Sequence, residues 1–173
     1  WGVYPMVQQL NSDFLKEWFM TNNGTNWRAD RSGGGMGGGW GEDTAALNYL
    51  GADTSDFQPY YQLKSAEKPN PWDDLVNTCD VLNNSTPAAL DSLLPNVLDI
   101  DRTLWFLASE ILFCDDDSYV YKGKMDYYLY YEKETGRITP QEYDGNSALE
   151  LNLATSWSPF YHETNVNYPL LNK

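Results

Sequence analysis

The sequence is poor in the side chains that nucleophilic and redox chemistry most often use. Its 173 residues include a single histidine, His162, and two cysteines, Cys79 and Cys114. A catalytic triad therefore has no support, and His162 is interpreted as a surface residue. The cysteines lie in unrelated segments and form no Cys-x-x-Cys pair. We expect two buried free thiols, because an unpaired cysteine packs as a small apolar side chain; one disulfide between them is the alternative.

Basic side chains are also scarce. The chain has 11 Lys and Arg against 25 Asp and Glu, which gives a formal net charge of −14 and a pI of about 4.2. That balance argues against nucleic acid as a partner, since binding its backbone requires Lys and Arg to neutralise phosphates. It also disfavours an anionic membrane surface. An anionic substrate would therefore need metal ions or a local basic patch.

Long apolar runs are missing as well, and none approaches the roughly 20 residues that span a bilayer. Aromatic side chains, in contrast, make up 15% of the chain, which argues against disorder. The length fits one domain or part of a larger one. Because the chain opens on a strand-like stretch without an initiator Met and closes on an incipient helix, we expect a fragment whose two ends lie inside a domain.

The hydrophobic pattern predicts a mixture of helices and strands. Asn70 and Pro71 are read as the N-cap and first residue of a helix, and the nearly all-round apolar helix after Asp99 is expected to be central and largely buried. The glycine-rich segment 33–41 cannot be regular structure and is interpreted as a surface loop, with a phosphate-covering loop as the alternative. The remaining predicted elements are strands at 2–9, 25–29, 45–50 and 60–64, helices at 13–20, 87–94 and 99–113, and a hairpin of 126–132 and 137–143.

Carboxylates are expected to converge at the open end of that hairpin. If its turn lies at 134–136, Asp126 and Asp144 become neighbours, and the loop that carries Asp115, Asp116 and Asp117 leads to the same end. Like charges this close raise one another's pKa unless a cation lies among them. Ligands that coordinate only through oxygen atoms suit Mg²⁺, Mn²⁺ or Ca²⁺. The alternative is that the acidic loop is simply solvated.

The order of these parts resembles that of protein kinases, in which a catalytic-loop Asp, a metal-binding Asn, a hairpin and a metal-binding Asp follow one another. The motifs themselves resemble the spore-coat-protein-H (CotH) kinase-like family. They are Asp115-Asp116-Asp117-Ser118-Tyr119, Met125-Asp126-Tyr127-Tyr128, Glu142-Tyr143-Asp144-Gly145-Asn146 and Tyr61-Gln62-Leu63-Lys64. Similar landmarks occur over nearly the whole chain, from Gly2-Val3-Tyr4 to Pro169-Leu170-Leu171.

This resemblance implies an α+β, atypical protein-kinase-like fold with two lobes, here as an internal fragment that lacks the first strands and the closing helices. Residues 1–68, including the glycine-rich loop, would be the N-lobe-like part and residues 69–173 the C-lobe-like part. The family likeness also implies a secreted or cell-surface protein that uses ATP and Mg²⁺ to phosphorylate Ser or Thr of a protein substrate.

The resemblance further assigns roles to individual residues. One of Asp115, Asp116 and Asp117 would orient the acceptor hydroxyl, and Asp117 is favoured. Asp126, Asp144 and Glu142 would hold the metal. Lys64 and Arg28 would face the phosphates, whereas Lys122 and Lys124 are interpreted as solvated loop charges.

The chain also departs from the family pattern, so other functions stay open. Asp126 stands in place of an Asn, Gln141-Glu142 in place of Trp-Asp, and Gln8 and Gln9 where a Glu is usual. One alternative is a catalytically degenerate surface module that binds calcium and serves a structural role in an extracellular assembly. A further alternative, carbohydrate binding, is suggested only by the abundance of Trp and Tyr, which fall mostly at core spacings.

Overall fold

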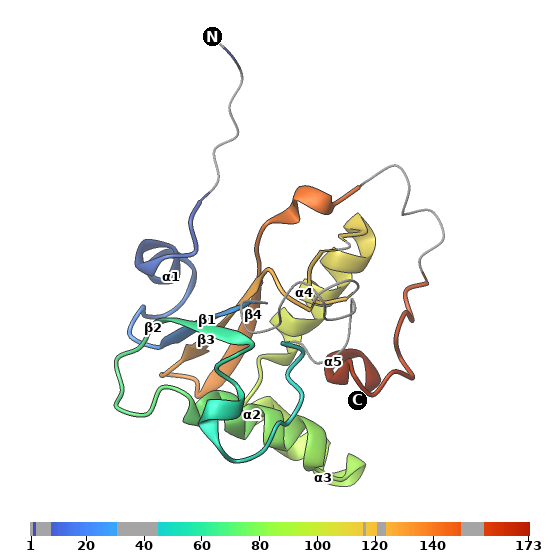
Figure 1. Ribbon diagram of the computed structural model, residues 1–173, viewed down its shortest axis with the longest axis horizontal. Coiled ribbons are helices and arrows are strands. Elements are labelled where there is room, and N and C mark those ends of the chain that lie inside the picture. Colours follow the sequence, from blue (N-terminus) through green and yellow to red (C-terminus); the bar gives the residue numbers. More distant parts are fainter. Residues whose placement is uncertain (1, 3–7, 31–44, 116, 121–123, 150–157) are drawn as a thin grey trace.

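The computed structural model describes residues 2, 8–30, 45–115, 117–120, 124–149 and 158–173. These residues form helices around a small sheet (Figure 1), so the expected α+β class is confirmed. The helices are α1 (Ser12–Trp18), α2 (Asp73–Asn84), α3 (Pro87–Leu93), α4 (Ile100–Phe113) and α5 (Pro169–Asn172). The strands are β1 (Thr25–Ala29), β2 (Tyr61–Ser65), β3 (Tyr127–Glu132) and β4 (Arg137–Glu142). Short 3₁₀ turns lie at Thr54–Asp56, Leu94–Asn96 and Gly145–Ser147.

The four strands form one antiparallel sheet in the order β2-β1-β3-β4. The predicted hairpin forms as β3 and β4, with Tyr127 opposite Glu142 at its open end. Its turn uses Gly136 at a φ of +71°, a backbone conformation that glycine adopts at little cost. Strands from residues 1–68 and from residues 69–173 thus pair in one sheet, and the division of the chain into two lobes stays a prediction.

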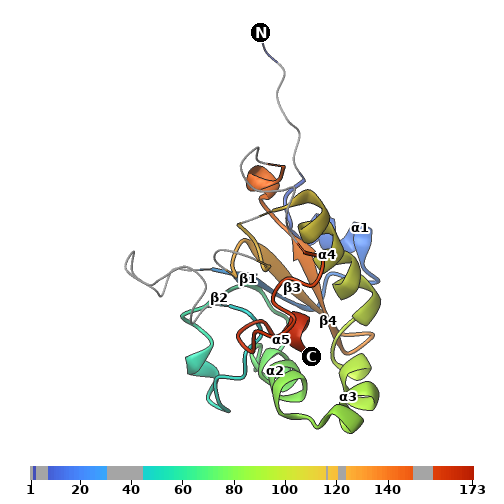
Figure 2. The ribbon, with the colours of Figure 1, turned by 90° about the vertical axis from the view of Figure 1, so that its right-hand side faces the viewer.

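The core lies between this sheet and the helices α2 and α4 (Figure 2). Trp27 of β1 and Leu129 of β3 are fully buried, as are Leu75 and Cys79 of α2. From α4, Phe106 packs into the same core. Burial of these large apolar side chains is the main favourable contribution to folding. Cys79 and Cys114 are both buried and neither forms a disulfide, which confirms the expectation of two buried thiols.

The predicted strand at 45–50 is wrong. Leu47 has a φ of +62°, which a β-strand does not allow. Buried backbone groups must find partners, and tyrosine hydroxyls provide them here in place of a neighbouring strand. The carbonyls of Ala45 and Ala46 accept hydrogen bonds from the hydroxyls of Tyr127 and Tyr119, and the N–H of Leu47 donates to a third hydroxyl, that of Tyr61.

Two expectations about helices also need correction. Helix α2 begins at Asp73 with Trp72 as its cap, not at Asn70-Pro71, because the Trp72 ring packs against Trp27 (ring centroids 6.5 Å apart) and Lys68 pairs with Asp74. Helix α4 begins after Asp99 as predicted, but it is not largely buried. Leu104, Trp105 and Leu112 are 60%, 69% and 72% exposed, because no described segment covers that side of the helix.

Several expectations fall outside the described residues. They include the glycine-rich loop at 33–41, residues 3–7 of the first predicted strand, Asp116 and Lys122. The described ends of that first segment, Gly2 and Gln8 to Gln9, are not in a strand. Among the described helices, none combines the length and apolar character needed to cross a membrane.

Candidate active site

An ion pair joins the first strand to the entrance of the hairpin. Arg28 Nη2 of β1 lies 2.6 Å from Asp126 Oδ1, one residue before β3. Asp126 has a left-handed φ of +56° and donates its N–H to the carbonyl of Ala29. Partial burial lowers the pKa of Arg28, but the hydrogen bond and charge of Asp126 leave it raised overall. The guanidinium also lies over the Tyr143 ring, 4.9 Å from its centroid, in a cation–π contact.

Arg28 opens onto a cavity of about 470 Å³. The same cavity is lined by Lys64 of β2, which is exposed and donates to Gln62 Oε1 at 3.3 Å. Tyr128 and Tyr143 supply aromatic walls, with ring centroids 5.1 Å apart. The two cations predicted to face phosphates are therefore brought to one cavity.

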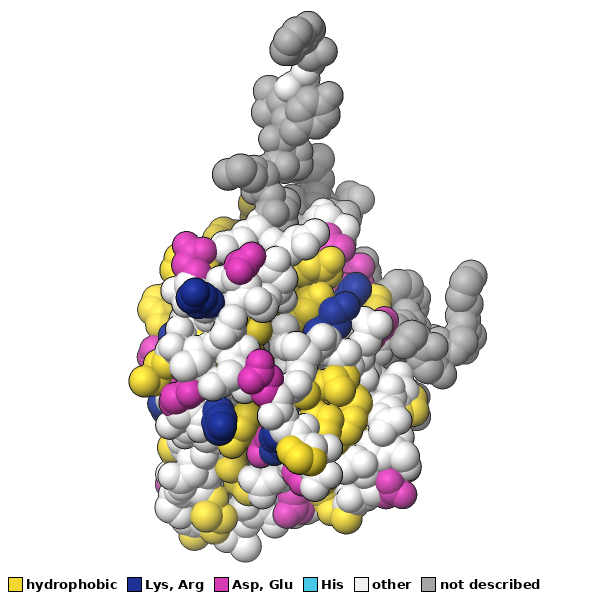
Figure 3. Space-filling view, turned by 90° about the vertical axis from the view of Figure 1, so that its left-hand side faces the viewer, with side chains coloured by type: hydrophobic (Ala, Val, Ile, Leu, Met, Phe, Trp, Pro, Cys, Tyr) yellow, Lys and Arg dark blue, Asp and Glu magenta, His cyan; other side chains and the backbone are white. Residues whose placement is uncertain are grey.

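Basic and acidic side chains are interspersed on the face that includes α1 and β2. Figure 3 shows Lys and Arg side chains lying among Asp, Glu and hydrophobic ones on this side of the molecule. The net charge of −14 is thus not gathered into one acidic surface on this face.

A group of carboxylates lies where α4, the acidic loop and β4 meet. Glu110 of α4 is 1% exposed and accepts hydrogen bonds from Ser118 Oγ at 2.5 Å and from the N–H of Val120 at 2.9 Å. Burial, together with the charge of Glu142, raises the pKa of Glu110 well above its usual value. Asp115 follows α4, is 3% exposed and donates its N–H to the Glu110 carbonyl.

Glu142 ends β4 and completes this group. The residue is exposed, but its carboxyl group lies against Asp115 and Glu110. Burial and the charge of Asp115 raise the pKa of Glu142 to about 8.

The structure brings together some of the predicted site residues. Asp115 and Glu142 contact each other, and Asp117 donates its N–H to Asp115 Oδ1 at 3.3 Å. Asp144 follows β4, is exposed and has a φ of +62°. Asp126, in contrast, is engaged by Arg28. Asp116 is not among the described residues.

Sequence reasoning did not identify Glu110. The available signal was an acidic residue inside an otherwise apolar helix, because a carboxylate is buried only when it has partners. Here its partners are the hydroxyl and two N–H groups of Ser118, Tyr119 and Val120. Glu110 thereby holds the loop that follows α4 against the helix.

Within the described part of the chain, no group of three or more His, Cys, Asp or Glu side chains is placed to hold a metal ion. The donors at the end of the hairpin nevertheless have suitable chemistry, because they are carboxylates that repel one another when ionised. A hard divalent cation between them would relieve that repulsion. The residues present thus fit such an ion in donor type.

Lys124, interpreted as a solvated loop charge, is packed instead. It is 1% exposed, and its Nζ lies 4.4 Å from the centroid of the Tyr168 ring. His162, interpreted as a surface residue, is half-buried, and its ring stacks on the Tyr168 ring with centroids 3.8 Å apart and planes 8° from parallel. Both contacts arise because Tyr168 offers an aromatic face, which a sequence pattern does not reveal.

Comparison with known proteins identifies one family. No curated protein matches the chain. The family model described as CotH kinase protein matches residues 1–172, which is essentially the whole sequence. The resemblance seen in the motifs is thereby confirmed, and the chain belongs to the CotH kinase family.

Proposed function

We propose that this domain transfers the γ-phosphate of ATP to a Ser or Thr hydroxyl of a protein substrate, with Mg²⁺ or Mn²⁺. The observation that carries the proposal is that Arg28 and Lys64 line one cavity, and that the ion pair of Arg28 with Asp126 joins this cavity to the open end of the hairpin, where Glu142 ends β4. A phosphoryl-transfer site needs this combination, in which cations hold phosphates and carboxylates hold the metal. Family membership supports the same reaction class.

In this proposal, the nucleotide occupies the cavity of about 470 Å³. Lys64 and Arg28 contact its phosphates, and the rings of Tyr128 and Tyr143 provide apolar surface for the base. Asp144, Glu142 and Asp126 are the ligands assigned to the divalent cation. These residues would hold the ion, which would supply positive charge to neutralise the charge that develops on the transferred phosphate.

The acidic loop provides the residue that orients the acceptor. Asp117 is our candidate to accept a hydrogen bond from the attacking hydroxyl, with Asp115 and Asp116 as the neighbouring alternatives. Asp115 supports this position, since its Oδ1 accepts the Asp117 N–H. Glu110 holds the loop that carries Asp117 in place, because its carboxylate accepts hydrogen bonds from Ser118, Tyr119 and Val120.

We extend the proposal to location and partners. A secreted or cell-surface protein kinase would meet its protein substrate outside the cytoplasm, and the two-lobed organisation of its family would place ATP between the lobes. The scarcity of basic residues, 11 of 173, supports a protein partner over nucleic acid.

A second candidate is a module of the same fold that binds Ca²⁺ and has a structural role in an extracellular assembly. The Arg28–Asp126 ion pair favours this candidate, because each side chain neutralises the charge of the other. Arg28 then attracts ATP phosphates less strongly, and Asp126 attracts the catalytic metal less strongly. Such a module would melt at a higher temperature with Ca²⁺ and would show no response to nucleotide.

The experiment compares wild-type protein with Asp144→Ala and with Asp91→Ala, a matched control at an exposed Asp on α3. Transfer of labelled phosphate from Mg·ATP to casein and to the protein itself is measured. We expect Asp144→Ala to lose about 100-fold in rate and Asp91→Ala to equal wild type. Equal rates in all three proteins would contradict the proposal, and a melting shift with Ca²⁺ alone would favour the second candidate.

A further inference from the structure

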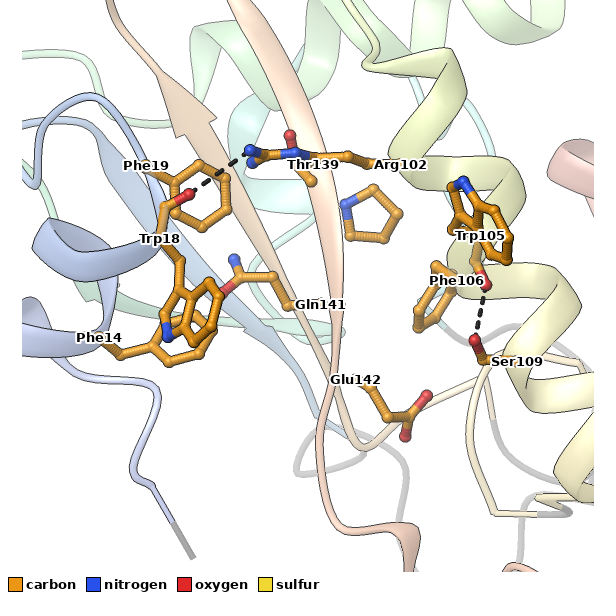
Figure 4. Close-up of a pocket in the computed structure, with 11 residues that line it drawn as sticks. Phe14, Trp18, Phe19, Arg102, Trp105, Phe106, Ser109, Thr139, Gln141 and Glu142 are labelled. Atoms are coloured by element: carbon orange, nitrogen blue, oxygen red, sulfur yellow. Dashed lines mark hydrogen bonds between the residues drawn. The ribbon is translucent and has the colours of Figure 1, made fainter.

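A second cavity, of about 370 Å³, lies between α1, α4 and the edge strand β4 (Figure 4). Its size is within the range of ligand pockets, which are mostly apolar with a few polar groups. Phe14 and Trp18 line it from α1 and Trp105 lines it from α4. Trp18 is 57% exposed and Trp105 is 69% exposed. Large apolar rings gathered at a surface cavity are typical of binding sites.

The polar group at the centre of this cavity is the amide of Gln141. The residue is only 8% exposed, and neither its Nε2 nor its Oε1 has a hydrogen-bond partner among the described residues. Figure 4 shows the side chain directed from β4 towards Phe14 and Trp18. Buried amides almost always have partners, so this amide is suited to pair with a bound group. A carboxamide offers a donor and an acceptor together, and a peptide group matches both.

Two charged residues line the same cavity, Arg102 and Glu142, and Arg102 already has protein partners. Arg102 of α4 donates from Nη2 to the carbonyl of Trp18 at 3.4 Å and lies over the Phe19 ring, 4.8 Å from its centroid. Figure 4 shows this side chain crossing from α4 to the end of α1. It therefore links the two walls, and the ligand does not need to be an anion.

The cavity leads to the candidate active site, because Glu142 lines it at the end of β4. We propose that it binds an aromatic or large aliphatic side chain of the protein substrate, close to the acceptor Ser or Thr, while Gln141 pairs with an adjacent main-chain amide. This inference rests on the proposed kinase function. A sugar fits less well, since many of its hydroxyl groups would lose water against the apolar walls without gaining partners.

Binding is tested without ATP, so that it does not depend on phosphate transfer. Fluorescence anisotropy is measured with labelled peptides that each carry one Ser and one Phe at a scanned spacing, and with matched peptides in which Ala replaces Phe. We expect one spacing to bind best and its Ala partner to bind about 10-fold more weakly. Trp105→Ala should remove that preference, and the nearly isosteric Gln141→Leu should weaken the same peptide about 3- to 10-fold.

Leu112→Ala is the matched control, because Leu112 is a 72% exposed apolar residue of α4 outside the cavity lining. It should bind all peptides as wild type does. Melting curves check that each variant is folded. If Trp105→Ala does not fold, peptide binding by Gln141→Leu alone tests the inference. Equal binding by wild type and both cavity variants would overturn the inference. So would binding of cello- or chito-oligosaccharides that these variants abolish.

The same peptides then serve as phosphate acceptors. Trp105→Ala should raise KM for the preferred peptide and leave kcat unchanged, which is the pattern of lost binding without lost chemistry. If Asp144→Ala transfers phosphate as well as wild type while the Phe preference persists in binding, the kinase proposal fails and the peptide site stands. If transfer depends on Asp144 but no peptide preference exists, only the present inference fails.

Discussion

Arg28 and Asp126 lie 98 residues apart in sequence, yet Arg28 Nη2 is 2.6 Å from Asp126 Oδ1. The pair joins β1 to the start of β3 where both strands reach the candidate active site. It is partly buried, with side chains 28% and 19% exposed. One of the two predicted phosphate-binding cations and a predicted metal ligand thus form a direct contact.

This pair should stabilise the fold. We expect Arg28→Gln and Asp126→Asn each to lower the free energy of unfolding by about 1–2 kcal/mol, because each leaves a partly buried group without its partner. Asn is chosen because it tolerates the left-handed backbone of position 126. Urea denaturation of the single and double variants measures the coupling. A double variant whose loss equals the sum of the single losses would show that the contact contributes nothing.

Glu110→Gln should loosen the loop after α4. The replacement keeps the shape but turns one acceptor oxygen into a donor, which opposes the Ser118, Tyr119 or Val120 donor that faces it. We expect a loss of about 1–3 kcal/mol in stability, the cost of an unsatisfied buried group. Glu67→Gln, at an exposed position, is the control. Chemical denaturation that gives the same midpoint for both variants would contradict the role of Glu110.

Gly24→Ala should be strongly destabilising. An added Cβ would lie 1.9 Å from the Tyr131 carbonyl oxygen and 2.8 Å from the Tyr130 ring, so the backbone of β3 would have to move. Overpacking of this kind costs about 3 kcal/mol. At Gly145 an added Cβ would lie 3.6 Å from Asp115 Oδ2, its nearest neighbour, so Gly145→Ala should change thermal stability little. Similar melting temperatures for the two variants would refute the close approach.

Stability should fall in mild acid because of His162. Burial, aided by the positive charge of Lys124, lowers the pKa of His162 below its usual value of 6.5. The unfolded chain therefore takes up a proton at this residue at a higher pH than the folded chain does. The contribution of His162 is complete above pH 6.5 and is lost as the pH falls from there through the folded pKa. Urea denaturation of wild type and His162→Gln between pH 7.5 and 5.5 should show a smaller decline in the variant; equal declines would exclude this cause.

The local pattern predicted much of the secondary structure. The Tyr-rich segment and its Gly136 turn were enough to predict the hairpin of β3 and β4, because alternation and turn chemistry act over a few residues. Strand β1 and helices α3 and α4 were likewise placed within a residue of their observed bounds. The segment at 45–50 was misread, since its backbone groups bind hydroxyls of Tyr61, Tyr119 and Tyr127 that come from distant parts of the chain.

The candidate site was likewise predicted only where local pattern decides the structure. The hairpin register alone placed Asp126 and Asp144 at one end of the sheet, and the loop after α4 brought Asp115 there. The sequence pattern could not show that Arg28 would form an ion pair with Asp126, or that Glu110 would be buried beneath the loop. Nor could it show that Lys124 would lie against Tyr168. Each of these contacts joins segments whose separation in sequence carries no periodic signal.

The sequence by itself determined the net charge, the α+β class and the family, since these follow from composition and from motifs in fixed order. Tertiary structure alone decided which charges are paired, which carboxyl groups repel one another and which aromatic rings remain exposed. The physical reason is that pairing, burial and exposure depend on packing between distant segments, and a sequence pattern describes only neighbours along the chain.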